Sequence, residues 1–149
     1  MSEVDSTVET VFREQCGRVT AALIRISGSF DRAEEAVQEA FAAALASWPA
    51  KGVPDNPGAW IMATAHRRLI DSARRDRTRR DKQDQLQYHL EGHGSSSNDE
   101  PDYAAMEYPD DRLRLICTCC HPALSEDARV ALTLRTLGGL TTGEIAKAF

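Results

Sequence analysis

The spacing of hydrophobic residues in the first half of the chain predicts three α-helices. Apolar side chains in 4–26 recur mostly at intervals of three, four or seven residues, which places them on one face of a helix. The segments 33–48 and 60–69 repeat this pattern, and the third helix runs on into arginine-rich sequence to about Arg80. No stretch alternates apolar and polar residues over the length of a strand, so we expect an all-α fold.

Capping and helix-breaking residues predict where these three helices begin and end. The segment 27–29 (Ser-Gly-Ser) separates the first helix from the second, and the prolines and glycine in 49–54 end the second. In a capping box, the N-cap residue is followed three positions later by glutamate, and proline is favoured at the first helical position. The expected helix starts are Ser6 with Glu9, Asp31 with Glu34, and Asn56 with Pro57.

The composition changes after the third helix. Between 92 and 109 the chain consists largely of Gly, Ser, Asn, Asp, Glu and Pro, which cannot bury enough apolar surface to form a core. We therefore expect an acidic flexible linker over 83–110, between a first domain at 1–82 and a second domain at 111–149.

Helical signals return after the linker. One helix is expected to end before Pro122, and its apolar face is formed by Leu113, Ile116, Cys117 and Cys120. Ser125 caps a second helix that the glycines at 138–139 close, with an apolar stripe of Ala128, Ala131, Leu134 and Leu137. Thr141 and Glu144 form a capping box for a third helix.

These last elements open a helix-turn-helix unit, but the second, groove-reading helix does not follow them. Ile145 and Phe149 are therefore expected to lack a packing partner within the chain. We expect the sequence to be a fragment cut before that helix.

Charge is strongly segregated along the chain. The net charge of −5 hides local values of −4 in 1–65, +5 in 66–82, −8 in 83–111 and +2 in 112–149. Local charge, rather than the total, decides contact with a polyanion. The basic segment 66–82 is therefore a candidate for nucleic-acid binding despite the acidic total.

Composition and motifs argue against several classes of protein. No uncharged apolar run approaches the roughly 18 residues of a membrane span, and no apolar stretch follows the acidic N-terminus, so we expect neither a membrane protein nor a secretory signal. Three of the four cysteines lie within 117–120, a poor disulfide framework, which favours a reduced cytoplasmic protein. Phosphate-binding loops, nucleotide-binding glycine motifs, paired-histidine helices and nucleophile elbows are missing, so we expect no enzyme and no cofactor.

The cysteine cluster has two interpretations. Cys117, Cys120 and His121 lie at positions i, i+3 and i+4, so one helical face could present three ligands to zinc. A fourth ligand is not obvious, because Cys119 points elsewhere on a helix and the other candidates are distant in sequence. Buried cysteine acting as a small hydrophobic residue is the favoured interpretation, and no metal is expected.

Two blocks of the sequence resemble the sigma factors of bacterial RNA polymerase, and most closely their extracytoplasmic-function class. The segment 124–146 is similar to the start of the fourth region of these factors. The segment 118–124 (TCCHPAL) resembles a subgroup whose members usually carry a long C-terminal extension. The block similar to the second region comes first in the chain and consists of 31–41 (DRAEEAVQEAF), Trp48, 56–60 (NPGAW) and 65–71 (AHRRLID).

The resemblance implies an all-α fold with a three-helix sigma region 2 domain, the acidic linker and a partial region 4. It also implies a function: directing core RNA polymerase to specific promoters and assisting promoter opening. In such factors the second helix binds the coiled-coil clamp of the largest polymerase subunit. On composition alone a merely solvated acidic face is preferred, and the resemblance reverses that preference. The residues expected at the clamp are Asp31, Glu34, Glu35, Gln38 and Glu39.

The resemblance further implies that the third helix faces the promoter and that bases of the unwound non-template strand are captured there. Arginine suits this role because its planar fork pairs with phosphate, although Asp71 and Asp76 interrupt the run. The loop 51–56 ahead of the helix is the candidate base pocket. The residues expected at DNA are Asn56, Trp60, His66, Arg67, Arg68, Arg74 and Arg75.

Some of these positions depart from the family or have a second interpretation. The family usually has asparagine where this chain has Arg67, and often arginine where it has His66, so the preferred base does not follow from the resemblance. Trp60 could stack near DNA, but an aromatic residue on an amphipathic helix is more often part of the core. The core is the favoured position for Trp60, and more strongly for Trp48.

Two other functions stay open. A protein–protein regulator could bind polymerase through the same helices without reading DNA, and promoter-specific transcription would separate the two. A one-component helix-turn-helix repressor is a weaker alternative, because its reading unit would have to be complete. The expected partners are core RNA polymerase and promoter DNA, with no membrane. An anti-sigma factor and a missing C-terminal extension of the chain itself stay open as further partners.

Overall fold

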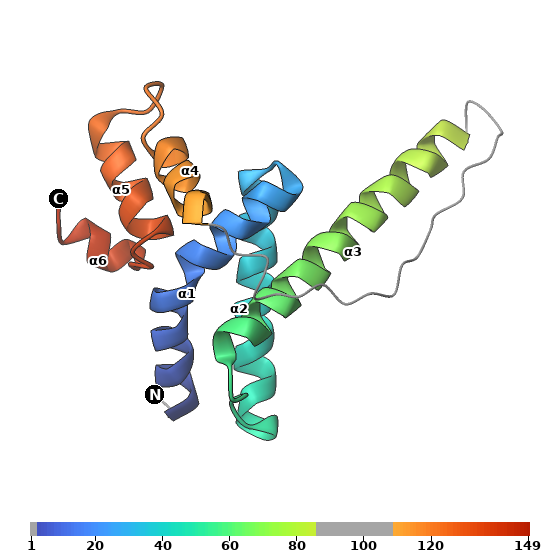
Figure 1. The fold of residues 1–149 in the computed structure, drawn as a ribbon, viewed down its shortest axis with the longest axis horizontal. Coiled ribbons are helices and arrows are strands. Elements are labelled where there is room, and N and C mark those ends of the chain that lie inside the picture. Colours follow the sequence, from blue (N-terminus) through green and yellow to red (C-terminus); the bar gives the residue numbers. More distant parts are fainter. Residues whose placement is uncertain (1–2, 86–108) are drawn as a thin grey trace.

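The computed structural model describes residues 3–85 and 109–149, and all regular secondary structure in these two stretches is helical. The predicted all-α fold is confirmed. Residues 86–108, which include most of the predicted linker 83–110, lie outside the described part of the chain. The helices are α1 (Glu3–Ser27), α2 (Phe30–Lys51), α3 (Pro57–Gln85), α4 (Pro109–Cys119), α5 (Glu126–Thr136) and α6 (Thr142–Ala146) (Figure 1).

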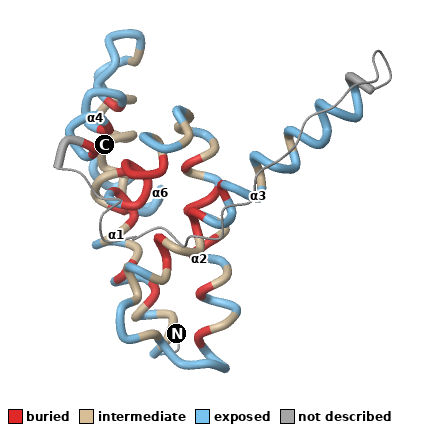
Figure 2. Tube along the Cα trace, turned by 45° about the vertical axis from the view of Figure 1, so that its right-hand side comes forward, coloured by how far each residue is buried: buried red, intermediate tan, exposed pale blue. Residues whose placement is uncertain are grey.

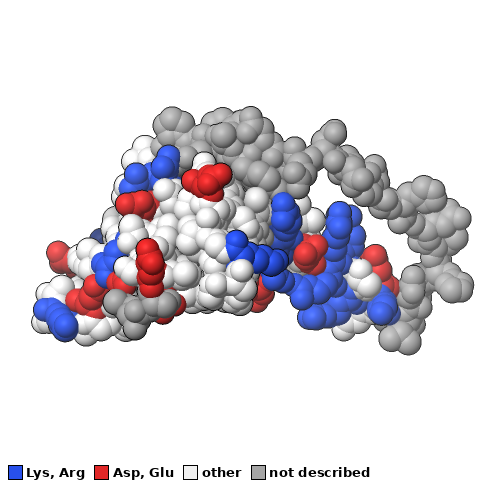
Figure 3. All heavy atoms as spheres, turned by 90° about the horizontal axis from the view of Figure 1, so that it is seen from below, with Lys and Arg blue, Asp and Glu red and all other residues white. Residues whose placement is uncertain are grey.

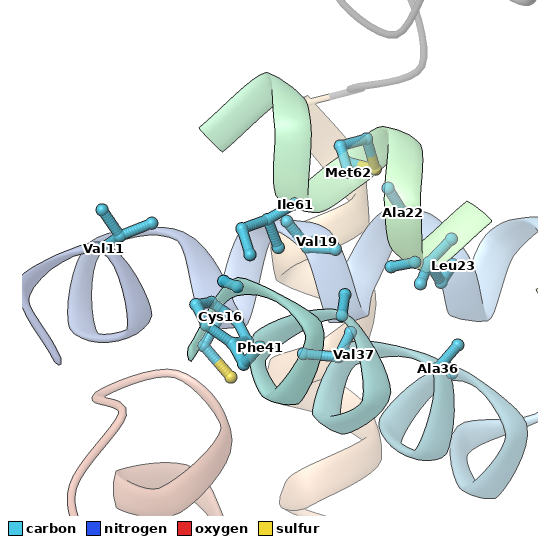
Figure 4. Packing of buried hydrophobic residues seen from close by; sticks show 14 of the residues in the cluster. Val11, Cys16, Val19, Ala22, Leu23, Ala36, Val37, Phe41, Ile61 and Met62 are labelled. Carbon is cyan, nitrogen blue, oxygen red and sulfur yellow. The ribbon is translucent and has the colours of Figure 1, made fainter. Parts of the chain in front are cut away.

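Helices α1, α2 and α3 pack around one apolar core (Figure 4). Leu23 of α1 and Ile61 of α3 are completely buried, and each such side chain contributes about 1.5–3 kcal/mol when it leaves water. The buried face of α2 is rich in small residues, which let the neighbouring helices approach closely. They are Ala33, Ala36, Ala40 and Ala44.

Two pairs of aromatic rings link the three helices. Trp48 of α2 is 2% exposed and meets the half-buried Trp60 of α3 edge to face, with 5.4 Å between the ring centroids. Phe12 of α1 and Phe41 of α2 form a second edge-to-face pair at 5.0 Å. The preference for a core position is therefore confirmed for Trp48, and Trp60 packs against the same core.

The predicted starts of α1 and α2 were wrong. Helix α1 already begins at Glu3, so Ser6 lies inside it and accepts a hydrogen bond from the Thr10 hydroxyl through its backbone carbonyl, at 3.0 Å. In α2 the N-cap is Ser29 rather than Asp31, because the Ser29 hydroxyl accepts the Arg32 N–H at 3.4 Å. Both predictions failed because acidic residues are favoured in the first turn of a helix as well as at its N-cap. The sequence pattern alone does not distinguish these two positions.

The junction between α2 and α3 agrees better with the sequence. Pro49 does not end α2, which continues to Lys51 and closes when Gly52, at a φ of +85°, donates its N–H to the Trp48 carbonyl at 2.8 Å. Asn56 caps α3 as predicted, and its side-chain oxygen accepts the Ala59 N–H at 3.0 Å. Helix α3 runs five residues past its expected end near Arg80, since no glycine or proline interrupts 81–85.

Helices α4 and α5 pack against α1 on the side away from α3, and α6 packs against α5 (Figure 1). Leu115 and Cys119 of α4 are buried against Ala21 of α1, whereas all four residues of the predicted apolar face, Leu113, Ile116, Cys117 and Cys120, are exposed. That prediction was wrong. The sequence of α4 offers two apolar stripes, and an ion pair between Arg25 and the buried Asp111 turns the Leu115 stripe toward α1.

The predicted caps in the C-terminal part are confirmed. The Ser125 hydroxyl accepts the Ala128 N–H at 3.3 Å, and Thr141 with Glu144 forms a complete capping box at the start of α6. Gly139 adopts a φ of +62°, which closes the turn between α5 and α6. Of the two residues expected to lack a packing partner, Phe149 is 64% exposed, whereas Ile145 is half-buried.

His66 lies in the core rather than on the surface. The buried residues of α3 follow a helical repeat, and His66 is part of it at 7% exposure, together with Ile61, Met62, Ala65 and Leu69. The expectation that His66 contacts DNA is therefore corrected, because its side chain faces away from the exposed side of α3. Burial lowers the pKa of the His66 imidazole, since the charged form loses its hydration.

The buried tryptophan of α2 generates a prediction for stability. Trp48→Ala should lower the free energy of unfolding by about 3–5 kcal/mol, because it leaves a cavity beside Trp60. Leu45→Ala on the exposed face of the same helix should change it by no more than about 0.5 kcal/mol. Urea unfolding followed by circular dichroism measures both values. Equal losses in the two variants would contradict the packing described here.

The buried histidine generates a prediction for pH dependence. Because the pKa of His66 is lowered in the folded state, the unfolded chain binds the proton more readily. The stability that His66 contributes is therefore complete above its unfolded pKa, near 6.5, and is lost as the pH falls below it. Urea unfolding at pH 7, 6 and 5 should show this loss, and His66→Asn should reduce it. An unchanged pH profile in His66→Asn would contradict the assignment.

Candidate functional site

Two surfaces of opposite charge lie on neighbouring helices. The arginine surface of α3 consists of Arg67, Arg68, Arg74, Arg75, Arg77, Arg79 and Arg80, all of which are exposed. The acidic surface of α2 consists of Asp31, Glu34, Glu35, Gln38 and Glu39. Figure 3 shows the Lys and Arg side chains gathered over the projecting half of α3, at the right of the view.

The second half of α3 extends away from the core (Figures 1 and 2). No residue from 70 to 83 is buried, so this part of the helix has no apolar face to hide. A helix of 29 residues is about 43 Å long, and its outer half can therefore meet an extended polyanion without displacing core residues. Its arginines face solvent on several sides, which suits contacts to the phosphates of a single strand.

Two ion pairs hold α3 against α2. Arg32 donates to Asp76 at 2.9 Å, and Arg68 lies 3.7 Å from the Glu39 carboxylate. All four side chains are between 35% and 48% exposed, so each pair contributes little to stability. These pairs instead affect which charges the surface presents. The Asp76 carboxylate pairs with Arg32 of α2, so the arginines beside Asp76 on α3 stay accessible to a ligand. Arg32 was missed by the sequence reasoning, since this pairing depends on how the two helices cross.

The acidic surface is not uniform. Asp31, Glu35 and Gln38 are exposed, whereas Glu34 is half-buried and accepts a hydrogen bond from the Gln38 side-chain amide at 3.3 Å. At its other edge Glu39 is engaged with Arg68 of α3. The carboxylates of the acidic surface that are exposed to solvent are therefore those of Asp31 and Glu35.

Apart from Arg67 and Arg68, which lie midway along α3, the DNA candidates that are not buried fall into two groups. Asn56 and Trp60 lie at the start of α3, where Asn56 is the N-cap and Trp60 packs on Trp48. Arg74 and Arg75 lie four to five turns further along the same helix, about 27 Å from Asn56. Only an extended ligand could reach both groups. The loop 51–56, predicted as a base pocket, is mostly exposed and lies at the first of these two ends.

The cysteine cluster is not assembled as a metal site. Cys117, Cys120 and His121 are exposed, and the His121 Nδ1 accepts the Ala123 N–H at 3.1 Å. Cys119, expected to point away from the site, is completely buried and lies 3.2 Å from the Thr136 hydroxyl. Within 3–85 and 109–149, no three His, Cys, Asp or Glu side chains are grouped so that they could hold a metal ion.

Comparison with known proteins identifies the N-terminal half of the chain. Residues 12–80 match the Sigma-70 region 2 family. The chain is also 40% identical over 129 residues to an uncharacterized protein of Rhizobium meliloti (strain 1021), an alignment that covers 86% of this chain and 30% of that relative. No solved structure matches significantly. None of the helices described here combines the length and apolar character needed to cross a membrane.

The matched segment covers most of α1, all of α2 and most of α3, which are the helices that share the apolar core and carry both charged surfaces. The match also covers the first of the two blocks that resemble sigma factors, residues 31–71. Residues 12–80, which carry both charged surfaces, are therefore similar to the Sigma-70 region 2 family.

Proposed function

We propose that this chain binds core RNA polymerase and promoter DNA as part of a sigma factor that directs transcription initiation. The observation that carries the proposal is the division of charge within the region 2 domain, with carboxylates on α2 and arginines on α3. One helix thus suits a basic protein surface and the next suits a polyanion. The protein would act where polymerase acts, in the cytoplasm, and without catalytic chemistry of its own.

The proposed polymerase contact is the acidic surface of α2. Glu35 and Asp31 present carboxylates to solvent on a helix whose opposite face is anchored in the core. A rigid helical face with exposed carboxylates is complementary to a basic coiled coil, such as the clamp of the largest polymerase subunit. Electrostatic attraction of this kind raises the association rate and selects the partner.

The proposed DNA contact is the arginine surface of α3 together with the start of that helix. Arg74 and Arg75 project where no core residue competes for space, and Asn56 and Trp60 stand at the other end of the helix. A single strand lying along α3 could meet phosphate-binding arginines and a stacking surface in sequence. His66 is excluded from this contact by its burial.

We further propose that the protein belongs to the extracytoplasmic-function class, in the subgroup with a C-terminal extension. The support is the motif at 118–124 and the curated relative, of whose length this chain spans about 30%. In this proposal the segment 111–149 is the start of region 4. A regulator that binds polymerase without reading DNA is the alternative that the two experiments below distinguish.

The polymerase contact predicts a charge-reversal effect. Glu35→Lys should weaken binding of the chain to core RNA polymerase by about tenfold or more, because a lysine would face a basic partner surface. Glu14→Lys, an equal change of charge at an exposed position of α1, is the matched control and should change affinity little. Fluorescence titration of the labelled chain with core polymerase measures both. Equal effects in the two variants would exclude α2 as the specific contact.

The DNA contact predicts a change in salt dependence. If about four phosphates are bound, the logarithm of the affinity for single-stranded DNA should fall with the logarithm of salt at a slope near −3, from about −0.7 per phosphate. Arg74→Ala with Arg75→Ala should reduce that slope to about −1.4, while Arg112→Ala on α4 should leave it unchanged. Anisotropy of a labelled non-template oligonucleotide with the polymerase complex provides the slopes.

If the double variant Arg74→Ala with Arg75→Ala and the control Arg112→Ala show the same salt slope, the assignment of α3 as the DNA contact is contradicted. If polymerase binding depends on Glu35 but no variant alters DNA binding or promoter-specific transcription, the alternative regulator is favoured.

A further inference from the structure

The segment α4–α6, called the C-terminal unit here, is docked on α1 of the region 2 domain. Its first anchor is the ion pair in which Arg25 donates to Asp111 at 3.0 Å, with the Asp111 side chain only 3% exposed. Beside this pair, Leu115 and Cys119 pack on Ala21 and are almost fully buried. Removing Arg25 would take the partner of this pair away from the buried Asp111 carboxylate, so the contact favours this position of α4.

A second anchor brings the backbone at the end of α5 close to α1. A Cβ atom added at Gly17 would lie 3.1 Å from the Thr136 carbonyl oxygen and 3.2 Å from the Leu137 Cα. The Arg135 guanidinium lies 5.6 Å from the centroid of the Phe12 ring, a cation–π distance. The absence of a side chain at Gly17 is therefore what allows α5 to lie directly on α1.

A third anchor joins α6 to the first half of α1. Arg13 donates to Glu144 at 2.7 Å, and Glu144 also completes the capping box with Thr141. The hydrogen bond from Arg13, with those from the Thr141 backbone and hydroxyl, lowers the pKa of Glu144 to about 2. The pair therefore stays ionised at any physiological pH.

The docked unit borders the proposed polymerase contact. A small cavity of about 30 Å³ lies between α1, α2 and α5, and its lining includes Glu34 and Gln38 from the acidic surface together with Arg135 and Thr136 from α5. One edge of the acidic surface thus faces the C-terminal unit. A helix with its side chains is about 10–12 Å across, so a two-helix coiled coil placed on α2 would extend into the space that α5 occupies.

We propose that the docked C-terminal unit and the polymerase coiled coil compete for the Glu34–Gln38 edge of α2, so that the docked chain is an autoinhibited form. The inference rests on the proposed function. Polymerase binds the form in which α5 has left α1, and the observed affinity is reduced by the fraction of chains that remain docked. By linkage, bound polymerase must favour undocking by the same factor by which docking weakens polymerase binding.

The reactivity of Cys119 reports docking directly. Its thiol is completely buried between α1, α4 and α5, whereas Cys117 and Cys120 are exposed and serve as internal controls. Alkylation by a maleimide, read for each cysteine by mass spectrometry, should be slow at Cys119 in the free chain. Saturating core polymerase should accelerate alkylation of Cys119 without accelerating it at the two control thiols. A Cys119 thiol that stays protected on polymerase would overturn the proposal.

A variant with a large side chain in place of Gly17, called the wedge variant, tests whether undocking of α5 strengthens polymerase binding. Gly17→Leu should force α5 away from α1 without weakening α1 itself, since leucine is a better helix former than glycine. We expect faster alkylation of Cys119 and an affinity for polymerase raised about three- to tenfold. Gly143→Leu is the control, because no atom lies within 4 Å of a Cβ at that glycine. The tryptophan fluorescence of Trp48 and Trp60, which pack on each other in the core, verifies that the core remains folded.

The outcomes separate this inference from the proposed function. If polymerase binds and Glu35→Lys abolishes binding, but the wedge exposes Cys119 without raising the affinity, only the competition is wrong. If polymerase does not bind any variant, including the wedge, the proposed function fails. If the wedge leaves Cys119 protected, the docking contact at Gly17 is wrong and the proposal falls with it.

Discussion

The burial of α1 on two sides is the constraint on which the rest of the structure depends. From Cys16 to Leu23 every residue of α1 except Arg18 is buried. Val19 and Leu23 face the core shared with α2 and α3, and Gly17 and Ala21 face α4 and α5. An ordinary surface helix has one apolar stripe. Helix α1 is buried on two sides and therefore packs against both helical units. The small residues on the second side permit the close approach that larger side chains would prevent.

The charged surfaces follow from that arrangement. Because the core anchors the inner faces of α2 and the first half of α3, their outer faces can be mostly polar without loss of stability. Asp76 on α3 and Arg32 on α2, whose charges are opposite to those of the surfaces around them, pair with each other. The ion pairs therefore matter less as a source of stability than as a means of keeping carboxylates and guanidinium groups on separate surfaces.

Sequence reasoning was most successful where the signal is local. The helical periodicity of 4–26 and 33–48 and the caps at Asn56, Ser125 and Thr141 depend on residues a few positions apart, and the structure agrees with them. It failed where a tertiary contact decides between equivalent patterns. Helix α4 has two apolar stripes, and the pairing of Asp111 with Arg25 selects one.

The candidate site shows the same division. The exposure of the arginines from Arg74 onward follows from the lack of large apolar residues in α3 beyond Ile70, which is visible in the sequence. The burial of His66 cannot be predicted from the sequence, because a histidine can occupy either side of an amphipathic helix. The packing of Ile61 and Met62 on α1 and α2 fixes the rotation of α3 and so decides which side His66 faces. The ion pairs between α2 and α3 likewise require the crossing of the two helices to be known.

Site-specific photocrosslinking in a complex of the full chain, core RNA polymerase and promoter DNA would test whether α2 contacts the polymerase while α3 contacts the DNA. A crosslinking amino acid at Gln38 on α2 and another at Arg75 on α3 would report the two surfaces in one experiment. We predict that the residue at position 38 crosslinks to the largest polymerase subunit. The residue at position 75 should crosslink to the non-template strand. Crosslinks from both positions to protein alone, or to no partner at all, would contradict the division of labour between the two helices.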